Sequence, residues 1–357
     1  MNMENIELLQ ALDELEESKG IPKEQLLDSL KAALKSAYGK SKHGPKKNAE
    51  IEIDEDTGEV RVYSRKQVVK EVENDQEEIL LEKAQTRNEN AELGEEIRIE
   101  VTPANFGRIA AQTAKQVVIQ RIREAERDIL YQEYITQEGE VITGTIQRSH
   151  KDNIIVDLDR TEALLIPREQ MEAEDYHAGK KIKVYIVEVE QTTKGPNILV
   201  SRTHPGLLKR LFEVEVPEIQ DGIVEVKSVS REAGSRSKLA VYSTDADVDP
   251  VGSCVGPSGS RVRMIVEELN GEKIDIVEWS EDIAEFISNA LNPAEVLEVK
   301  TDEKENVAQV IVPDDQLSLA IGKKGQNARL AAKLTGWKID IKSKSQVKSE
   351  KEDIEEE

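Results

Sequence analysis

Apolar and polar positions follow two different spacings in the first hundred residues. Apolar side chains recur every three or four positions over 5–19 and 22–38, which predicts two helices. Polar and apolar residues then alternate over 50–54 and 59–63, which predicts a β-hairpin, and 96–101 continues that alternation. We therefore expect a helix pair beside a small sheet.

Helical spacing returns after this sheet. From Phe106 to Ile129 apolar residues again recur at intervals of three and four, so we expect one long amphipathic helix. With the preceding elements it makes an N-terminal α+β domain over residues 1–130, in which the long helix is the connection to the next domain.

Residues 135–203 contain short alternating segments and no long helical pattern. The predicted strands are 141–148, 153–158, 162–166, 182–189 and 198–201. Five strands in this length favour a small OB-type β-barrel, although a small antiparallel sheet gives the same periodicity. Of its aromatic residues, only Tyr176 and Tyr185 are candidates for stacking on bases, so we expect this domain to bind RNA weakly through charge or to act as a spacer.

The last third of the chain contains one unit twice. Gly256-Pro257-Ser258-Gly259 precedes Lys273-Ile274-Asp275-Ile276, and Gly322-Lys323-Lys324-Gly325 precedes Lys338-Ile339-Asp340-Ile341. The two loops are 66 positions apart and the two strands 65 apart, which indicates an internal duplication. Each unit shows the order αββααβ, over 204–279 and 280–344.

A Gly-x-x-Gly loop between two helices lets the backbone approach a ligand, and it directs amide groups at a phosphate from a helix N-terminus. This pattern is typical of KH domains, which clamp about four nucleotides of single-stranded nucleic acid. A lone copy could equally be an ordinary helix cap, but two copies in register favour the KH hypothesis. The candidate RNA-binding residues are Gly256, Pro257, Ser258, Gly259, Arg261, Arg263, Gly322, Lys323, Lys324, Gly325, Asn327, Arg329 and Lys333.

The net charge of −23 opposes binding of a polyanion, but the charge is unevenly distributed. Residues 316–349 carry eight basic side chains and one acid, Asp340. Six lysines and no acid lie in 31–47, which is either a second basic surface or a solvated helix face. Because two lysines lie inside the second glycine loop, we expect that loop to be the stronger phosphate site.

Several classes of protein are disfavoured. No apolar stretch reaches the 18 residues of a membrane span and no leader is evident, so we expect a cytoplasmic protein without a membrane partner. The single Cys254 and four scattered histidines do not have the spacing of a metal site. A phosphate-binding Gly-x-x-x-x-Gly-Lys-Ser/Thr loop is also missing. We expect no catalytic residues, no metal and no cofactor.

Several segments carry a family resemblance: 112–117, 121–127, 249–256, 271–277, 289–291 and 315–327. They resemble the NusA family of bacterial transcription factors. The resemblance extends over nearly the whole chain and implies a multidomain α+β protein: an N-terminal α+β domain, an S1-type OB β-barrel and two tandem KH domains.

The resemblance also implies a function. The first domain would bind RNA polymerase near the RNA exit channel, while the barrel and KH domains hold nascent RNA. The protein would act as a monomer and modulate pausing and intrinsic termination. Together with other Nus factors, it would modulate antitermination. Lys40, Lys42 and Arg108 match positions that face an RNA hairpin at the exit.

Residues 345–357 are charged and poor in apolar groups, so we expect disorder there and no C-terminal acidic repeats. The alternative function is a free-standing single-stranded RNA-binding protein, an RNA chaperone or translational regulator without polymerase contact. A phosphorolytic exonuclease is disfavoured, because such enzymes carry a large catalytic core and place KH before the barrel.

Overall fold

The computed structural model contains two compact units, residues 1–129 and 130–357, which are treated separately. It describes residues 10, 12–13, 16–17, 22–40, 49–54, 57–75, 77–103, 106–172 and 174–355. Within these residues, no helix has the length and apolar character to cross a membrane.

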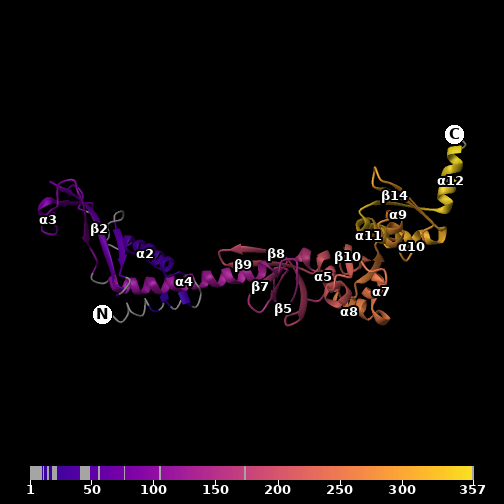
Figure 1. Cartoon of the computed structure of the whole chain (residues 1–357), viewed down its shortest axis with the longest axis horizontal. Helices are drawn as coiled ribbons and strands as arrows, with labels where there is room; N and C mark the ends of the chain where they lie inside the picture. Colours follow the sequence, from indigo (N-terminus) through magenta and orange to yellow (C-terminus); the bar gives the residue numbers. More distant parts are fainter. Residues whose placement is uncertain are drawn as a thin grey trace. The chain divides into compact units, whose positions relative to one another are not determined.

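The first unit contains the predicted helix and hairpin. Its elements are α2 (Lys23–Lys40), β1 (Ala49–Ile53), β2 (Val60–Val69), β3 (Glu78–Leu80), α3 (Leu81–Gln85), β4 (Glu96–Glu100) and most of α4 (Phe106–Ile135), whose last turns belong to the second unit (Figure 1). Strand β2 pairs antiparallel with both β1 and β4, which confirms the hairpin and the third strand. Tyr38 of α2 and Phe106 of α4 meet edge to face, 5.7 Å between ring centroids, in a core shared by both helices and the sheet. Of the first predicted helix, the described residues Gln10, Leu12, Asp13, Glu16 and Glu17 are helical.

The second unit starts with a five-stranded barrel, which confirms the OB-type prediction. Its strands are β5 (Val141–His150), β6 (Asn153–Asp157), β7 (Glu162–Leu165), β8 (Lys181–Thr192) and β9 (Gly195–Ser201). They close in the order β5-β6-β7-β9-β8, with β7 and β9 parallel and the other pairs antiparallel. Bulges in β5 and β8 provide the bending that a small barrel requires.

Two domains of order αββααβ follow the barrel and confirm the duplicated unit. The first contains α5 (Pro205–Glu215), a short α6 (Pro217–Gln220), β10 (Val224–Glu232), β11 (Arg236–Ser243), α7 (Pro250–Val255), α8 (Ser260–Glu268) and β12 (Lys273–Glu278). The second contains α9 (Ile283–Ala290), β13 (Glu298–Asp302), β14 (Val307–Val312), α10 (Leu317–Ile321), α11 (Gln326–Thr335) and β15 (Lys338–Ser343). In each sheet the central strand is antiparallel to the first and parallel to the last.

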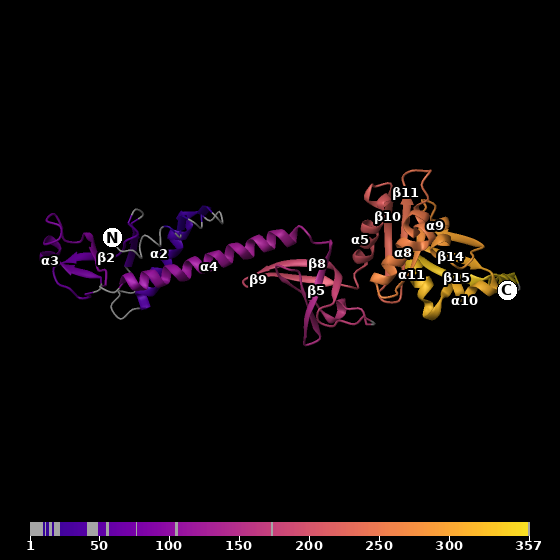
Figure 2. The same ribbon diagram turned by 90° about the horizontal axis from the view of Figure 1, so that it is seen from below.

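The two repeated domains share an apolar core. Ala240 and Val277 of the first domain pack with the core of the second, and Trp279 at the joint lies against the same cluster. The fully buried Lys238 donates from Nζ to the Asn292 carbonyl, 2.9 Å away, and so ties β11 to the loop after α9. Figure 2 shows α11 beside β10 and β11, consistent with the hydrogen bond from Ser228 Oγ to the Leu334 carbonyl. A short, packed joint therefore connects the domains.

The C-terminal segment differs from the prediction of disorder. Helix α12 spans Lys344–Glu355, and Ser345 at its first turn donates through Oγ and N to the carboxylate of Asp314, at 2.6 and 3.1 Å. These bonds anchor the start of the helix, and Lys, Gln and Glu have high helix propensity. The structure thus has a helix over Lys344–Glu355, where the composition predicts a disordered tail.

Candidate nucleic-acid interface

Each glycine loop lies between two short helices and has the same backbone. Gly256, Ser258 and Gly259 have φ of 73°, 53° and 73°, and Gly322, Lys324 and Gly325 have 77°, 54° and 73°. The loops lead into α8 and α11, so their amides lie at the positive ends of those helices. This geometry suits an anionic group, and the sequence repeat had predicted its duplication.

The second loop presents its lysines to solvent. Lys323 and Lys324 are exposed in the loop and Lys333 is exposed on α11. By contrast Pro257 occupies the position of Lys323 in the first loop and has no backbone N–H to donate. The second loop therefore combines more positive charge with one more amide donor.

A pocket of about 330 Å³ adjoins the second loop and is lined from both KH domains. The first domain contributes Arg236 and Lys273, and the second contributes Lys323. Arg236 also forms a two-point ion pair with Asp275, at 2.7 and 2.8 Å. Arg236 and Lys273 are not among the candidates predicted from sequence, because they lie on strands and join the loop only through the packing of two domains.

Arg329 is exposed in the first turn of α11, but its guanidinium is hydrogen-bonded within the protein. Its Nε donates to Glu232 Oε1 at 2.6 Å and its Nη1 donates to the Lys324 carbonyl at 3.3 Å. The hydrogen bond from Arg329 holds the pKa of the Glu232 carboxyl below its usual range. The guanidinium is therefore near the loop, in contact with a carboxylate of the neighbouring domain.

Asn327 lies beneath the loop, 4% exposed. Its Nδ2 donates to the carbonyls of Leu291, Ala320 and Leu319, at 2.9, 3.1 and 3.4 Å. These bonds satisfy carbonyls at the ends of α9 and α10. The structure gives this residue a supporting place instead of an exposed one.

The arginines of the first loop differ from each other. Arg261 is partly buried, donates to Glu218 at 2.7 Å and to the Ser253 carbonyl at 2.5 Å, and packs where a side chain on Gly256 would lie. Arg263 is exposed on α8 and donates to the Ser258 carbonyl at 3.1 Å. The structure therefore places Arg263 where a phosphate could reach it, and Arg261 inside the support of the loop.

The candidates of the first unit are described only in part. Arg108 is exposed in the first turns of α4. Lys40 is the last residue of α2, but its side chain lies outside the description, and Lys42 lies outside the described residues altogether. Their grouping remains a prediction.

Both candidate tyrosines of the barrel domain already contact other residues of the protein. Tyr185 stacks on His204 with 4.5 Å between ring centroids and packs against the core of the first KH domain. The Tyr176 hydroxyl accepts from the Met171 amide at 2.8 Å, and burial raises the pKa of this tyrosine. Neither ring is set out as a platform for bases, and the strength of RNA binding by this domain stays a prediction.

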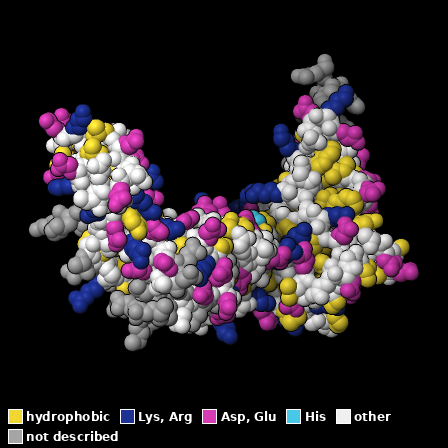
Figure 3. Space-filling view, turned by 60° about the vertical axis from the view of Figure 1, so that its left-hand side comes forward, with side chains coloured by type: hydrophobic (Ala, Val, Ile, Leu, Met, Phe, Trp, Pro, Cys, Tyr) yellow, Lys and Arg dark blue, Asp and Glu magenta, His cyan; other side chains and the backbone are white. Residues whose placement is uncertain are grey.

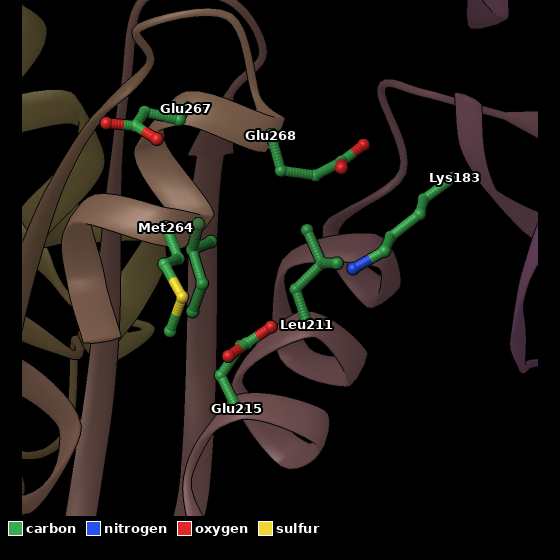
Figure 4. A pocket seen from close by; sticks show the side chains of 7 residues that line it. Lys183, Leu211, Glu215, Met264, Glu267 and Glu268 are labelled. Atoms are coloured by element: carbon green, nitrogen blue, oxygen red, sulfur yellow. The ribbon is translucent and has the colours of Figure 1, made fainter. Parts of the chain in front are cut away.

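A second pocket, of about 380 Å³, lies between β8 and helices α5 and α8 (Figure 4). Its labelled side chains include Glu215, Glu267 and Glu268 but only one cation, Lys183. An acidic lining opposes a phosphate backbone. Figure 3 likewise shows basic and acidic side chains interspersed over one face.

The described residues provide little for metal or thiol chemistry. No group of three or more His, Cys, Asp or Glu side chains among them could hold a metal ion. Cys254 is buried in α7, and burial raises the pKa of its thiol to about 12, so it is a neutral core residue.

Gly322→Ala is expected to lower the free energy of unfolding by about 2 kcal/mol. Gly322 combines φ 77° with ψ 172°, and an added Cβ would lie 2.8 Å from the Asn327 amide nitrogen. Urea unfolding followed by tryptophan fluorescence measures this, since Trp279 and Trp337 both pack against this core. The control is Gly325→Ala, where φ is 73° but the space is open, with an expected loss of about 1 kcal/mol. Equal losses in both variants would contradict the steric argument.

Known proteins match this chain over almost its whole length. The families that match are the NusA N-terminal domain over residues 7–128, the S1 RNA binding domain over 136–201, and the NusA-like first and second KH domains over 202–279 and 283–349. Among solved structures, the N-terminal domain of NusA from Bacillus subtilis also matches. The match covers 35% of this chain and 99% of the solved domain, with 49% identity and a TM-score of 0.32.

Curated relatives match nearly the whole chain. The chain is 59% identical to the transcription termination/antitermination protein NusA of Bacillus subtilis, over 95% of this chain and 91% of that protein. It is 57% identical to the protein of the same name from Halalkalibacterium halodurans, over 96% of this chain and 89% of that protein. It is 42% identical to the protein of the same name from Thermus thermophilus, over 94% of this chain and 89% of that protein. With four successive domains matched and such identity over nearly the full chain, this protein belongs to the NusA family.

Proposed function

We propose that this chain is a transcription elongation regulator that modulates pausing, intrinsic termination and antitermination. It binds bacterial RNA polymerase near the RNA exit channel and the nascent RNA at the same time. The observation that carries the proposal is the pair of matching KH loops, the second lysine-rich, in a chain that begins with a NusA N-terminal domain. It acts as a monomer in the bacterial cytoplasm, where polymerase and transcript occur.

The proposal divides the work among the domains. Residues 1–130 bind polymerase, and Lys40, Lys42 and Arg108 face an RNA hairpin at the exit. The S1-type barrel over 135–203 binds RNA weakly through charge or acts as a spacer. The KH domains over 204–279 and 280–344 clamp single-stranded RNA through their loops.

The chain works by binding and positioning, without a reaction of its own, a metal or a cofactor. Its loops hold phosphates with amide donors and lysines, and these groups serve affinity and register on RNA. Other Nus factors join it in antitermination. These roles are supported by the termination/antitermination name that its relatives carry.

A single-round transcription assay on a template with a hairpin pause tests this proposal. With the matching bacterial polymerase, the full chain is expected to lengthen the pause. A variant that lacks residues 1–129, the first compact unit, is expected to keep RNA binding and lose the effect on pausing.

The opposite results are equally informative. An unchanged pause lifetime with RNA binding intact would replace the proposal by a free-standing RNA-binding protein. Loss of RNA binding by the shortened chain would instead indicate that part of the RNA-binding surface lies in the first unit.

A further inference from the structure

Two equivalent arginines of the KH repeats have different partners. Arg263 and Arg329 both lie seven residues after the first glycine of their loops. Each donates to the carbonyl of the non-glycine residue with positive φ in its loop, Ser258 or Lys324. Arg329 additionally donates to Glu232, whereas no carboxylate pairs with Arg263 within the described part of the chain.

The extra carboxylate comes from the other domain. Glu232 ends β10 of the first KH domain and accepts from Arg329 Nε at 2.6 Å and Gln326 Nε2 at 2.8 Å. Gln326 is the first residue of α11, so a negative group of the chain itself lies at the positive end of the helix that follows the second loop. Arg329 holds the pKa of this carboxyl below its usual range, so Glu232 is ionised in neutral solution.

This ion pair borders the pocket beside the second loop. Gln326 and Ser235, which are joined by a 2.8 Å hydrogen bond, both line the pocket together with Lys323 and Gly322. An RNA backbone that follows the loop into the pocket would therefore meet the donors that Glu232 already occupies. Both members of the pair are partly exposed, with side-chain exposures of 25% for Glu232 and 47% for Arg329, so the pair can open without unfolding.

We propose that Glu232 is an internal anion that competes with an RNA phosphate for Arg329 and Gln326, and thereby sets the RNA affinity of the second KH loop. The inference rests on the proposed function and deepens it by naming a residue that limits affinity. Binding of RNA then exchanges an intramolecular carboxylate for a phosphate and loosens one tie between the KH domains. Arg263 lacks this competitor and is open to phosphate from the start.

The test is fluorescence anisotropy of the full chain with a fluorescein-labelled, unstructured single-stranded RNA of about 12 nucleotides, long enough to span two KH loops. Glu232→Gln is expected to bind about three- to tenfold tighter, because an ionic competitor is removed. Its salt dependence should steepen by about 0.7, the value for one added phosphate contact to a single strand. Glu232→Asp, which keeps the charge but withdraws it by one methylene, should shift affinity in the same direction by less.

Two controls separate contact from general charge. Glu303→Gln removes one exposed acid from the corresponding hairpin of the second domain and is expected to change affinity by less than about twofold. Adding Arg329→Gln to Glu232→Gln should abolish the gain. Weaker or unchanged binding by Glu232→Gln, a gain matched by Glu303→Gln, or a gain that survives loss of Arg329 would each overturn the inference. If the unaltered chain does not bind the RNA at all, the proposed function fails as well.

Discussion

Glu272→Ala is expected to lower the free energy of unfolding of the first KH domain by about 3–5 kcal/mol, because it leaves a buried arginine without its counter-ion. Glu272 and Arg231 both have fully buried side chains, and Arg231 Nη2 donates to Glu272 Oε2 at 2.9 Å. The carboxylate also accepts from Ser237 Oγ at 2.6 Å and from the Gly234 amide at 2.9 Å. Removal of one side chain therefore breaks several buried hydrogen bonds at once.

The same arginine connects the KH domain to the barrel. Arg231 Nη1 donates to the carbonyl of His204, which follows the last barrel strand and stacks on Tyr185 of β8. Nearby, the fully buried Arg202 bonds Glu174 of the barrel domain through two 2.9 Å contacts and Glu268 of α8 at 3.1 Å. Two buried arginines thus hold this junction, and loss of Glu272 should loosen it as well as the KH core.

Urea unfolding of the full chain, followed by circular dichroism, measures the effect. Glu267→Ala is the matched control: this glutamate is exposed on α8, and its replacement should change stability by less than about 0.5 kcal/mol. The double variant Arg231→Met with Glu272→Leu should recover much of the loss, since it removes both charges together. A loss below 1 kcal/mol for Glu272→Ala alone would contradict the role of the buried pair.

The glycine loops show what sequence can predict about this fold. Positive φ values are adopted at Gly256, Gly259, Gly322 and Gly325, and glycine adopts them without steric cost. The repeated glycines therefore predict the loop conformation from the sequence alone. The five barrel strands and the two αββααβ units were also predictable, because their apolar spacing depends on which face is buried. Element order and loop position therefore followed from short stretches of chain.

Side-chain roles were less predictable because they depend on distant segments. Glu272 belongs to a motif recognised in the sequence, but a glutamate beside Gly271 and Lys273 is expected at the surface, and its burial depends on Arg231. Asn327 and Arg261 were predicted to contact RNA from their positions after the loops, yet each is held by partners outside its own loop. Charged and amide side chains do not recur at a regular spacing along the sequence that would reveal such partners.

The short elements were missed for a related reason. Strand β3 has three residues and α3 has five, too few for any periodicity to stand out. Helix α12 was expected to be disordered from its composition, but its first turn depends on Asp314 of a preceding turn. In both cases tertiary contacts stabilise segments that local pattern does not.

Lys323→Glu combined with Lys324→Glu is expected to weaken binding of single-stranded RNA by about a hundredfold at moderate salt. Both lysines are exposed in the loop whose amides lie at the start of α11, so they are placed to neutralise phosphates held there. The exposed fraction of these side chains argues against a role in folding, and stability should stay nearly unchanged. Reversal of both charges removes two contacts and adds repulsion.

Salt dependence identifies the mechanism. Each lost phosphate contact should flatten the dependence of log affinity on log salt by about 0.7 to 1. The matched control is Lys83→Glu with Lys115→Glu, which makes the same change in net charge on α3 and α4 of the first unit. If both double variants lose affinity equally, total charge and not the loop governs binding. A selective loss in the loop variant, with a flatter slope, would show that a protein of net charge −23 grips RNA through a local cluster of amides and lysines.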